Sequence, residues 1–140
     1  MPKAKLTELH NEIDKMLSEG MALWEKYLKA PIPEEYRYFG ADEVAENYDG
    51  RHIIDLAAAC QCFFYFRYLH SDMESESDIR TLLGDYFFSR FSLSLIPIDS
   101  TELIDEFAAF LNEDTQSEPY RLDLAKLAAF FGRVNNVLYE

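Results

Sequence analysis

Four acidic side chains stand at every second position in the segment SDMESESD, which spans 71–78. Carboxylate oxygens are the ligands that Mg²⁺ prefers, usually together with phosphate groups of a substrate. Asp72, Glu74 and Glu76 are therefore the candidate ligands of a metal site. In a helix, Asp72 and Glu76 would share one face, because side chains four residues apart are neighbours. Serines separate these acids, however, and such alternation is equally typical of a solvated loop, which we expect here.

The histidines do not complete a recognisable catalytic motif. His10, His52 and His70 lie far apart in the sequence, outside any metal-binding or nucleophile pattern. His70 directly precedes Ser71 and Asp72, but adjacent side chains rarely point at one another, and no triad order is present. We therefore expect structural or surface histidines.

The two cysteines are Cys60 and Cys62. On a helix, side chains two residues apart point in different directions. They cannot readily form a disulfide with each other, and two thiols make a poor zinc site. We expect both to be buried, small apolar side chains of a protein in a reducing cytoplasm.

The charge and composition of the chain limit its partners. Its 140 residues carry a formal net charge of −13, from 13 basic and 26 acidic residues. This charge repels phosphate backbones, so we expect no nucleic-acid binding, and it favours a partner with a basic docking face. A hydrophobic fraction of 49% and an aromatic fraction of 15% suffice for a single domain, 1–140, with a sizeable core.

No segment predicts membrane insertion or export. The N-terminal residues lack the apolar core of a signal peptide. The long apolar segment 53–69 is interrupted by Asp55, Gln61 and Arg67, which favours a central helix of a bundle over a transmembrane segment. The expected location is cytoplasmic.

Apolar residues recur at steps of three and four along most of the chain, which predicts an all-α fold. We expect a single helical bundle of five or six helices. Pro31 and Pro33 end the first helix, and Pro97 ends the fourth. The expected helices span approximately 5–28, 41–48, 51–70, 78–96, 99–112 and 119–138.

Several residues have expected positions at helix ends and helix contacts. Asp78 is the expected N-cap of the fourth helix, and Asp99 to Glu102 resembles a capping box in which a carboxylate replaces the usual hydroxyl. Pro119 suits the first turn of the last helix. Gly20 and Gly84 lie inside expected helices. At Gly20 we expect a bend or a close helix contact, and at Gly84 the close approach of another helix. Segment 34–40 reads as a connection with exposed aromatic rings.

The basic residues near the acidic segment have simple expected partners. We expect Arg67, Arg80 and Arg90 to pair with neighbouring acids. Lys126 stands in the apolar last helix, where it either extends its ammonium group to the surface or pairs with Asp123.

Two segments carry a resemblance to a known family, the all-α trans-isoprenyl diphosphate synthases. The first is LHSD at 69–72, and the second is LLGDYFFSR at 82–90. In that family an apolar helix ends in an aspartate-rich motif, and a Gly-Asp-Tyr or Gly-Asp-Ala sequence opens the next helix. The matching positions here, which form a degenerate motif, are His70, Asp72, Gly84, Asp85 and Tyr86. The resemblance implies a truncated isoprenoid-synthase fold.

The departures from the family pattern point to a particular kind of member. Ser71 stands where the first motif aspartate would be, and the sequence contains no Asp-Asp dipeptide. This combination resembles the small, non-catalytic subunit of two-component hexaprenyl or heptaprenyl diphosphate synthases of isoprenoid biosynthesis. The resemblance implies a heterodimer with a large catalytic subunit, no catalytic residues and no cofactor in this chain, and Mg²⁺ on the partner subunit.

Surplus aromatic side chains are the candidate partner surface. Phe63, Phe64, Phe87, Phe88 and Phe91 could cover an apolar groove of a partner or limit the length of a growing polyprenyl chain; alternatively, they form the core of this chain. Two other functions stay open. One is an acidic α-helical adaptor that self-associates as a homodimer, and the other is a degenerate Mg²⁺-dependent prenyltransferase that uses the acids at 72, 74 and 76.

Overall fold

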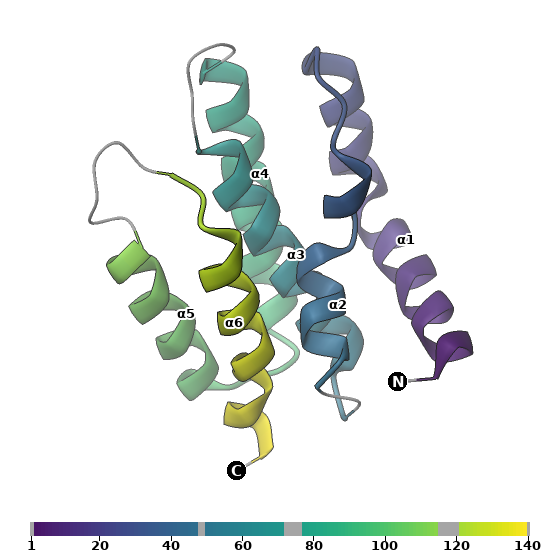
Figure 1. Cartoon of the computed structure of the whole chain (residues 1–140), viewed down its shortest axis with the longest axis vertical. Helices are drawn as coiled ribbons and strands as arrows, with labels where there is room; N and C mark the ends of the chain where they lie inside the picture. The colour runs from purple at the N-terminus through teal and green to yellow at the C-terminus, as the bar shows by residue number, and fades with distance from the viewer. Residues whose placement is uncertain (1, 48–49, 72–76, 115–120, 140) are drawn as a thin grey trace.

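A computed structural model describes residues 2–47, 50–71, 77–114 and 121–139. Within these residues the chain forms six α-helices, two short 3₁₀ helices and no strand, packed as a single bundle (Figure 1). The predicted all-α bundle is confirmed. The elements in chain order are α1 (Lys3–Tyr27), η1 (Glu34–Tyr36), α2 (Phe39–Ala45), α3 (Ile53–Leu69), α4 (Ser77–Leu95), α5 (Thr101–Asp114), α6 (Leu124–Val134) and η2 (Asn135–Tyr139).

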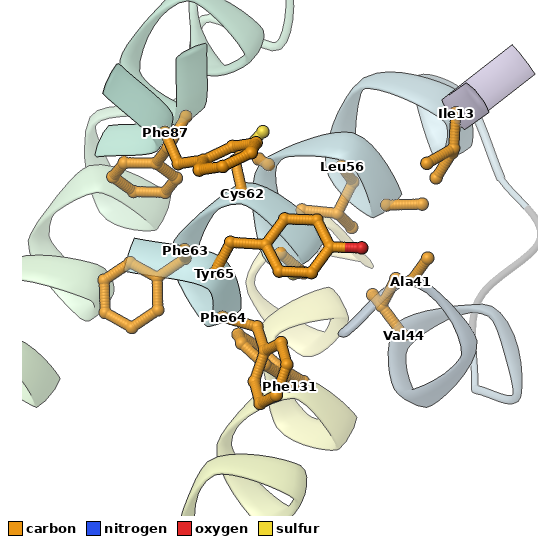
Figure 2. Packing of buried hydrophobic residues seen from close by; sticks show 14 of the residues in the cluster. Ile13, Ala41, Val44, Leu56, Cys62, Phe63, Phe64, Tyr65, Phe87 and Phe131 are labelled. Atoms are coloured by element: carbon orange, nitrogen blue, oxygen red, sulfur yellow. The ribbon is translucent and has the colours of Figure 1, made fainter. Parts of the chain in front are cut away.

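Helix α3 is the centre of the bundle. Residues 56–65 are all buried, because α1, α2 and α4 pack around α3 and the rings of α5 and α6 reach it. Figure 2 shows this core, in which Phe63, Phe64 and Tyr65 of α3 lie among side chains of the surrounding helices. A helix that is apolar on all sides is stable only when others surround it. None of the described helices is both long and apolar enough to cross a membrane.

Helix α1 packs against the core along one stripe of side chains and makes a close contact at Gly20. The buried stripe consists of Leu9, Ile13, Leu17, Gly20 and Trp24. A Cβ atom at Gly20 would lie only 2.7 Å from the Tyr86 ring and 2.9 Å from the Phe87 ring. The predicted close helix contact at Gly20 is thus confirmed, and the partner helix is α4.

Helix α2 is held by a side chain of α3. The side chain of Tyr38, the N-cap residue of α2, makes no capping hydrogen bond to the first turn. The buried Gln61 supplies the acceptor instead, since its Oε1 accepts hydrogen bonds from the backbone N–H groups of Gly40 at 2.9 Å and Ala41 at 3.1 Å. Its Nε2 donates to the carbonyl of Tyr36 at 3.1 Å. Both polar atoms of the buried Gln61 side chain are therefore hydrogen-bonded.

Two predicted helix starts need correction. Helix α4 begins at Ser77, so Asp78 lies within its first turn and is not its N-cap. At α5 the cap is Ser100, whose Oγ accepts from the backbone N–H of Leu103 at 3.1 Å. Asp99 adopts a left-handed backbone conformation, with φ of 53°, and precedes the cap. The predicted capping box was therefore one residue out of register.

The last helix starts later than the sequence predicted. Residues 121–123 are not helical, Asp123 caps α6 by accepting from the N–H of Lys126 at 3.1 Å, and Pro119 lies outside the described residues. Helix α5 extends to Asp114, beyond its predicted end. The aromatic rings of segment 34–40 were expected to be exposed, but Tyr36, Tyr38 and Phe39 are half-buried.

Candidate functional site

The residues that resemble the synthase motif meet at the contact between the C-terminus of α3 and α4. A Cβ atom at Gly84 would overlap the His70 imidazole, so glycine is what admits the ring. His70 Nε2 lies 3.2 Å from the Thr81 carbonyl oxygen and 3.4 Å from Asp85 Oδ1. Because a carbonyl only accepts hydrogen bonds, Nε2 carries the proton. The predicted close contact at Gly84 is confirmed, and its partner is His70.

The other motif positions do not join this cluster. Tyr86 turns towards Gly20 of α1. Ser71 is buried, and its hydroxyl donates to the Tyr68 carbonyl at 2.7 Å. Asp72, Glu74 and Glu76 lie outside the described residues, so the metal site and the solvated loop both stay predictions. Within the described part of the chain, no group of three or more His, Cys, Asp or Glu side chains is arranged to hold a metal ion.

Arg80 fixes the end of α3 through backbone carbonyls, while the nearby acids at 72, 74 and 76 lie outside the described residues. Its guanidinium donates to three backbone carbonyls, those of Tyr68 at 2.7 Å, Leu69 at 3.0 Å and Ser71 at 3.1 Å. The last carbonyls of a helix have no partner within the helix, and a cation there also interacts favourably with the helix dipole. Arg80 thus joins α4 to the C-terminus of α3.

The remaining basic residues also bind groups that are distant in the sequence. Arg67, buried with a side chain 3% exposed, donates to Asp114 at 2.7 Å, and Lys126 Nζ lies 3.4 Å from the same carboxylate. Arg90 donates to the Met16 carbonyl at 3.0 Å. Among the described residues, Arg67 and Arg90 thus bind groups that are distant in the sequence, and the ionic partner of Lys126 is Asp114 and not Asp123, because helix packing brings these groups together.

A half-buried polar cluster joins α1 to α2. His10 Nε2 lies 2.6 Å from Asp42 Oδ1, and the His10 ring stacks on Tyr38 with centroids 3.8 Å apart. The Tyr38 hydroxyl donates to Asp14 at 2.8 Å. Burial, together with Asp14, raises the Tyr38 pKa above its usual range. No local sequence pattern predicts this cluster, since its members are up to 32 residues apart.

Both cysteines are free and buried, as expected. Burial raises the pKa of Cys60 well above its usual range and raises that of Cys62 to about 12. A thiol that stays protonated is a poor nucleophile and a poor metal ligand. Cys60 and Cys62 therefore act as small apolar side chains of the core.

The five phenylalanines predicted as a partner surface divide into two groups. Phe63, Phe64 and Phe87 are fully buried (Figure 2). These three therefore belong to the core of this chain, which was the alternative to a partner surface. Phe88 is half-buried and Phe91 is 5% exposed. Phe88 and Phe91 line a pocket, with Phe63 among its walls.

This pocket, of about 400 Å³, lies between the C-terminal half of α4 and α5, and we call it the α4–α5 groove. Its other lining residues are Ser92, Leu95, Ile96, Asp99, Ile104, Phe107, Ala108 and Leu111. Ile96 and Ile104 are 67% and 49% exposed. A concave apolar site of this size is typical of ligand and peptide binding.

Sequence reasoning missed the α5 side of the groove. Helix α5 carries two adjacent apolar stripes. The first stripe consists of Leu103, Phe107 and Phe110, and it is buried. The second stripe is Ile104, Ala108 and Leu111, at steps of four and three residues. Together the two stripes make the apolar face of α5 wider than a single contact with the core requires. This width is the sequence signal that could have revealed the α5 wall of the groove.

One acidic residue lines the groove, and one of the helices that form it is acidic. Asp99 lines it, and Asp105 follows Ile104 on the exposed side of α5. Helix α5 contains five acidic residues and no lysine or arginine. The single basic residue of α4 beyond Phe88 is Arg90, whose guanidinium donates to α1. The groove therefore combines apolar walls with one acidic lining residue, Asp99, and lies beside an acidic helix.

Comparisons with known proteins give no relative of this chain: no family model, no curated protein and no solved structure matches it.

Proposed function

We propose that this chain is a non-catalytic regulatory small subunit of a two-component polyprenyl diphosphate synthase. In this role it binds a large catalytic subunit, supports its activity and helps to set the length of the product. Mg²⁺ belongs to the large subunit in this proposal, and this chain contributes packing and a binding surface.

The observation that carries the proposal is how the motif-like residues are used. Gly84 accommodates the His70 ring, Asp85 lies beside that ring, and Ser71 binds a backbone carbonyl. The contacts of His70 with Gly84 and Asp85 therefore join the end of α3 to α4, whereas the Ser71 hydrogen bond stays within the end of α3. In the synthase family the corresponding segment supplies ligands for Mg²⁺, which holds the allylic diphosphate and promotes its departure. A helix pair that retains the packing residues without the aspartate pairs suits a subunit that supports another chain.

The α4–α5 groove supports the same proposal, because it leaves apolar side chains exposed. Ile96 and Ile104 stand at its edge, with Phe88 and Phe91 in its walls. An exposed apolar patch rimmed by polar groups is typical of a protein-binding site. Three of the five phenylalanines proposed for partner binding or control of chain length, Phe63, Phe88 and Phe91, line the groove.

Reconstitution with a large subunit tests the proposal. A large subunit of a two-component polyprenyl diphosphate synthase, purified alone, is mixed with this chain, an allylic diphosphate, isopentenyl diphosphate and Mg²⁺. We expect a stable complex on gel filtration and a rise in long-chain product. No complex and no change in rate or product length, across large subunits of both the hexaprenyl and heptaprenyl types, would refute the assignment.

A second candidate is an acidic adaptor that self-associates. It is favoured by exposed apolar residues on α4 and α5: Leu82, Leu93, Ile96 and Ile104 are each at least 49% exposed. Sedimentation velocity separates the two functions. A homodimer that binds no large subunit supports the adaptor function. A monomer that forms a heterodimer with a large subunit supports the role as a synthase subunit.

A further inference from the structure

We propose that the α4–α5 groove binds an amphipathic helix whose apolar stripe is flanked by lysine or arginine residues. This inference rests on the proposed role as a binding subunit, but it does not depend on the partner being a prenyl synthase. It assigns the surface and the chemistry of the segment that docks there.

The shape of the groove fits a helix of a partner. Its walls run from Phe88 to Ile96 on one side and from Ile104 to Leu111 on the other, which is about two helical turns. Phe63 and Phe107 close the groove towards the core, where both are buried. A bound helix inserts anchors at positions i, i+3 or i+4, and i+7, and two turns accommodate such a set.

The exposure at the edges of the groove favours a protein segment over an enclosed small molecule. Ile96 and Ile104 stand on opposite walls and remain largely exposed, so a ligand confined between the walls would leave their outer faces in water. A helix that lies over the groove covers these faces as well as the interior. Apolar area removed from water contributes about 25 cal/mol per Å² before the costs of association.

The charge around the groove selects a basic helix. Asp99 lines the groove, and α5, which forms one of its walls, carries five acidic residues and no basic residue. Lysines or arginines beside the apolar stripe of a partner would face these carboxylates, whereas glutamates would be repelled. A second copy of this chain is disfavoured for the same reason, since its net charge is −13 and its own groove is acidic.

Designed peptides test the inference directly. Two fluorescent helical peptides of about five turns share one leucine stripe and differ only in the flanking residues, which are lysine in one and glutamate in the other. We expect the lysine peptide to bind at least about tenfold more tightly in fluorescence anisotropy, and its affinity to fall as NaCl rises. Equal binding of the two peptides, or no binding of either, would overturn the inference.

Two matched variants locate the binding surface. Ile104→Lys places a charge at the edge of the groove. Leu82→Lys, the control, places the same charge near the N-terminal end of α4, outside the groove lining, at a site that is 70% exposed. Both sites are exposed, so both variants should fold with unchanged circular dichroism. We expect Ile104→Lys to weaken binding of the lysine peptide at least about tenfold and Leu82→Lys to leave it unchanged. Equal effects of the two variants would place the binding surface elsewhere.

Two further measurements complete the test. Asp99→Asn removes a charge at a left-handed residue, where asparagine is well tolerated, and should weaken binding of the lysine peptide and reduce its salt dependence.

Sedimentation of the wild type tests whether a second copy of the chain occupies the groove instead. If the wild type is a dimer that Ile104→Lys dissociates, a second copy fills the groove and the inference is wrong. If the lysine peptide binds but no large subunit does, only the synthase assignment fails.

Discussion

The contact between His70 and Gly84 gives a physical reason for a glycine in the middle of α4. Glycine lowers helix stability by about 1 kcal/mol relative to alanine, so its presence there needs a compensating contact. The imidazole occupies the space that a Cβ would fill and donates to the Thr81 carbonyl. At the scale of the residue, His70 and Gly84 therefore contribute to the packing of α3 against α4.

We expect Gly84→Ala to lower the free energy of unfolding by about 1–3 kcal/mol, because the added methyl group displaces the His70 ring. Urea unfolding measures the change. Gly132→Ala in α6 is the matched control, since its Cβ would meet only Asn47 Nδ2, at 3.5 Å, and the variant should be as stable as the wild type or more stable. In the background of His70→Ala, Gly84→Ala should no longer destabilise. Persistent destabilisation in that background would contradict the proposed contact.

The buried thiols predict how stability depends on pH. The pKa of Cys62 is raised from its ordinary value of 9.0 to about 12 by burial. Above pH 9 the unfolded chain therefore loses this proton while the folded chain retains it, so the free energy of unfolding falls as pH rises from about 9 to 12. For Cys62 alone we expect a loss of about 1 kcal/mol between pH 8 and pH 10, measured by urea unfolding. Cys62→Ala should show a smaller loss, and an equal loss in both proteins would contradict this origin.

At the scale of the element, helices are completed by residues of other helices. Gln61 of α3 caps α2, and Arg80 of α4 caps the end of α3. Gly40 brings α2 against the α3 backbone, since a Cβ there would lie 2.5 Å from the Cys60 carbonyl oxygen. A short helix such as α2 is marginal by itself, so these tertiary contacts determine its position.

We expect Gln61→Ala to reduce the free energy of unfolding by at least about 2 kcal/mol, because the buried N–H groups of Gly40 and Ala41 lose their acceptor. Hydrogen exchange of these two amides should accelerate more than exchange in α6. The control is Asn47→Ala, which removes an exposed hydrogen bond to Glu43 and should change stability by less than about 0.5 kcal/mol. A similar effect of both substitutions would argue against the capping role.

At the scale of the whole molecule, one carboxylate joins three helices. Asp114 at the end of α5 accepts from the buried Arg67 of α3 and lies beside Lys126 of α6. Figure 1 shows α1 and α5 at opposite sides of the bundle, with α3 between them. The position of α5, and with it one wall of the α4–α5 groove, therefore depends on an ionic contact as well as on Phe107 and Phe110.

We expect Asp114→Ala to lower the free energy of unfolding by about 3–5 kcal/mol, because it leaves Arg67 buried without this partner. Thermal and urea unfolding measure the loss, and Glu113→Ala, at an exposed neighbour, is the control. The double variant Arg67→Met/Asp114→Leu should recover most of the stability, since it removes both charges. If the double variant were as unstable as Asp114→Ala, the loss would not come from the broken contact between Arg67 and Asp114.

Much of the secondary structure follows from the sequence because it depends on local spacing. Apolar residues at steps of three and four define the helices, and the apolar character of 53–69 on all sides predicts a surrounded helix. The errors at Asp78, at Asp99 and at the start of α6 concern helix ends, where neighbouring polar residues compete for the same cap. The burial of Cys60 and Cys62 was equally predictable.

The partners of side chains across the bundle were decided only by the tertiary structure. Arg67 and Asp114 are 47 residues apart, and Arg90 and the Met16 carbonyl are 74 apart, so no local pattern connects them. The division of the phenylalanines between core and groove depends on how α4 and α5 are rotated about their axes. Periodicity identifies an apolar face, but the packing of helices determines which part of that face a neighbour covers, and the α4–α5 groove is the part left open.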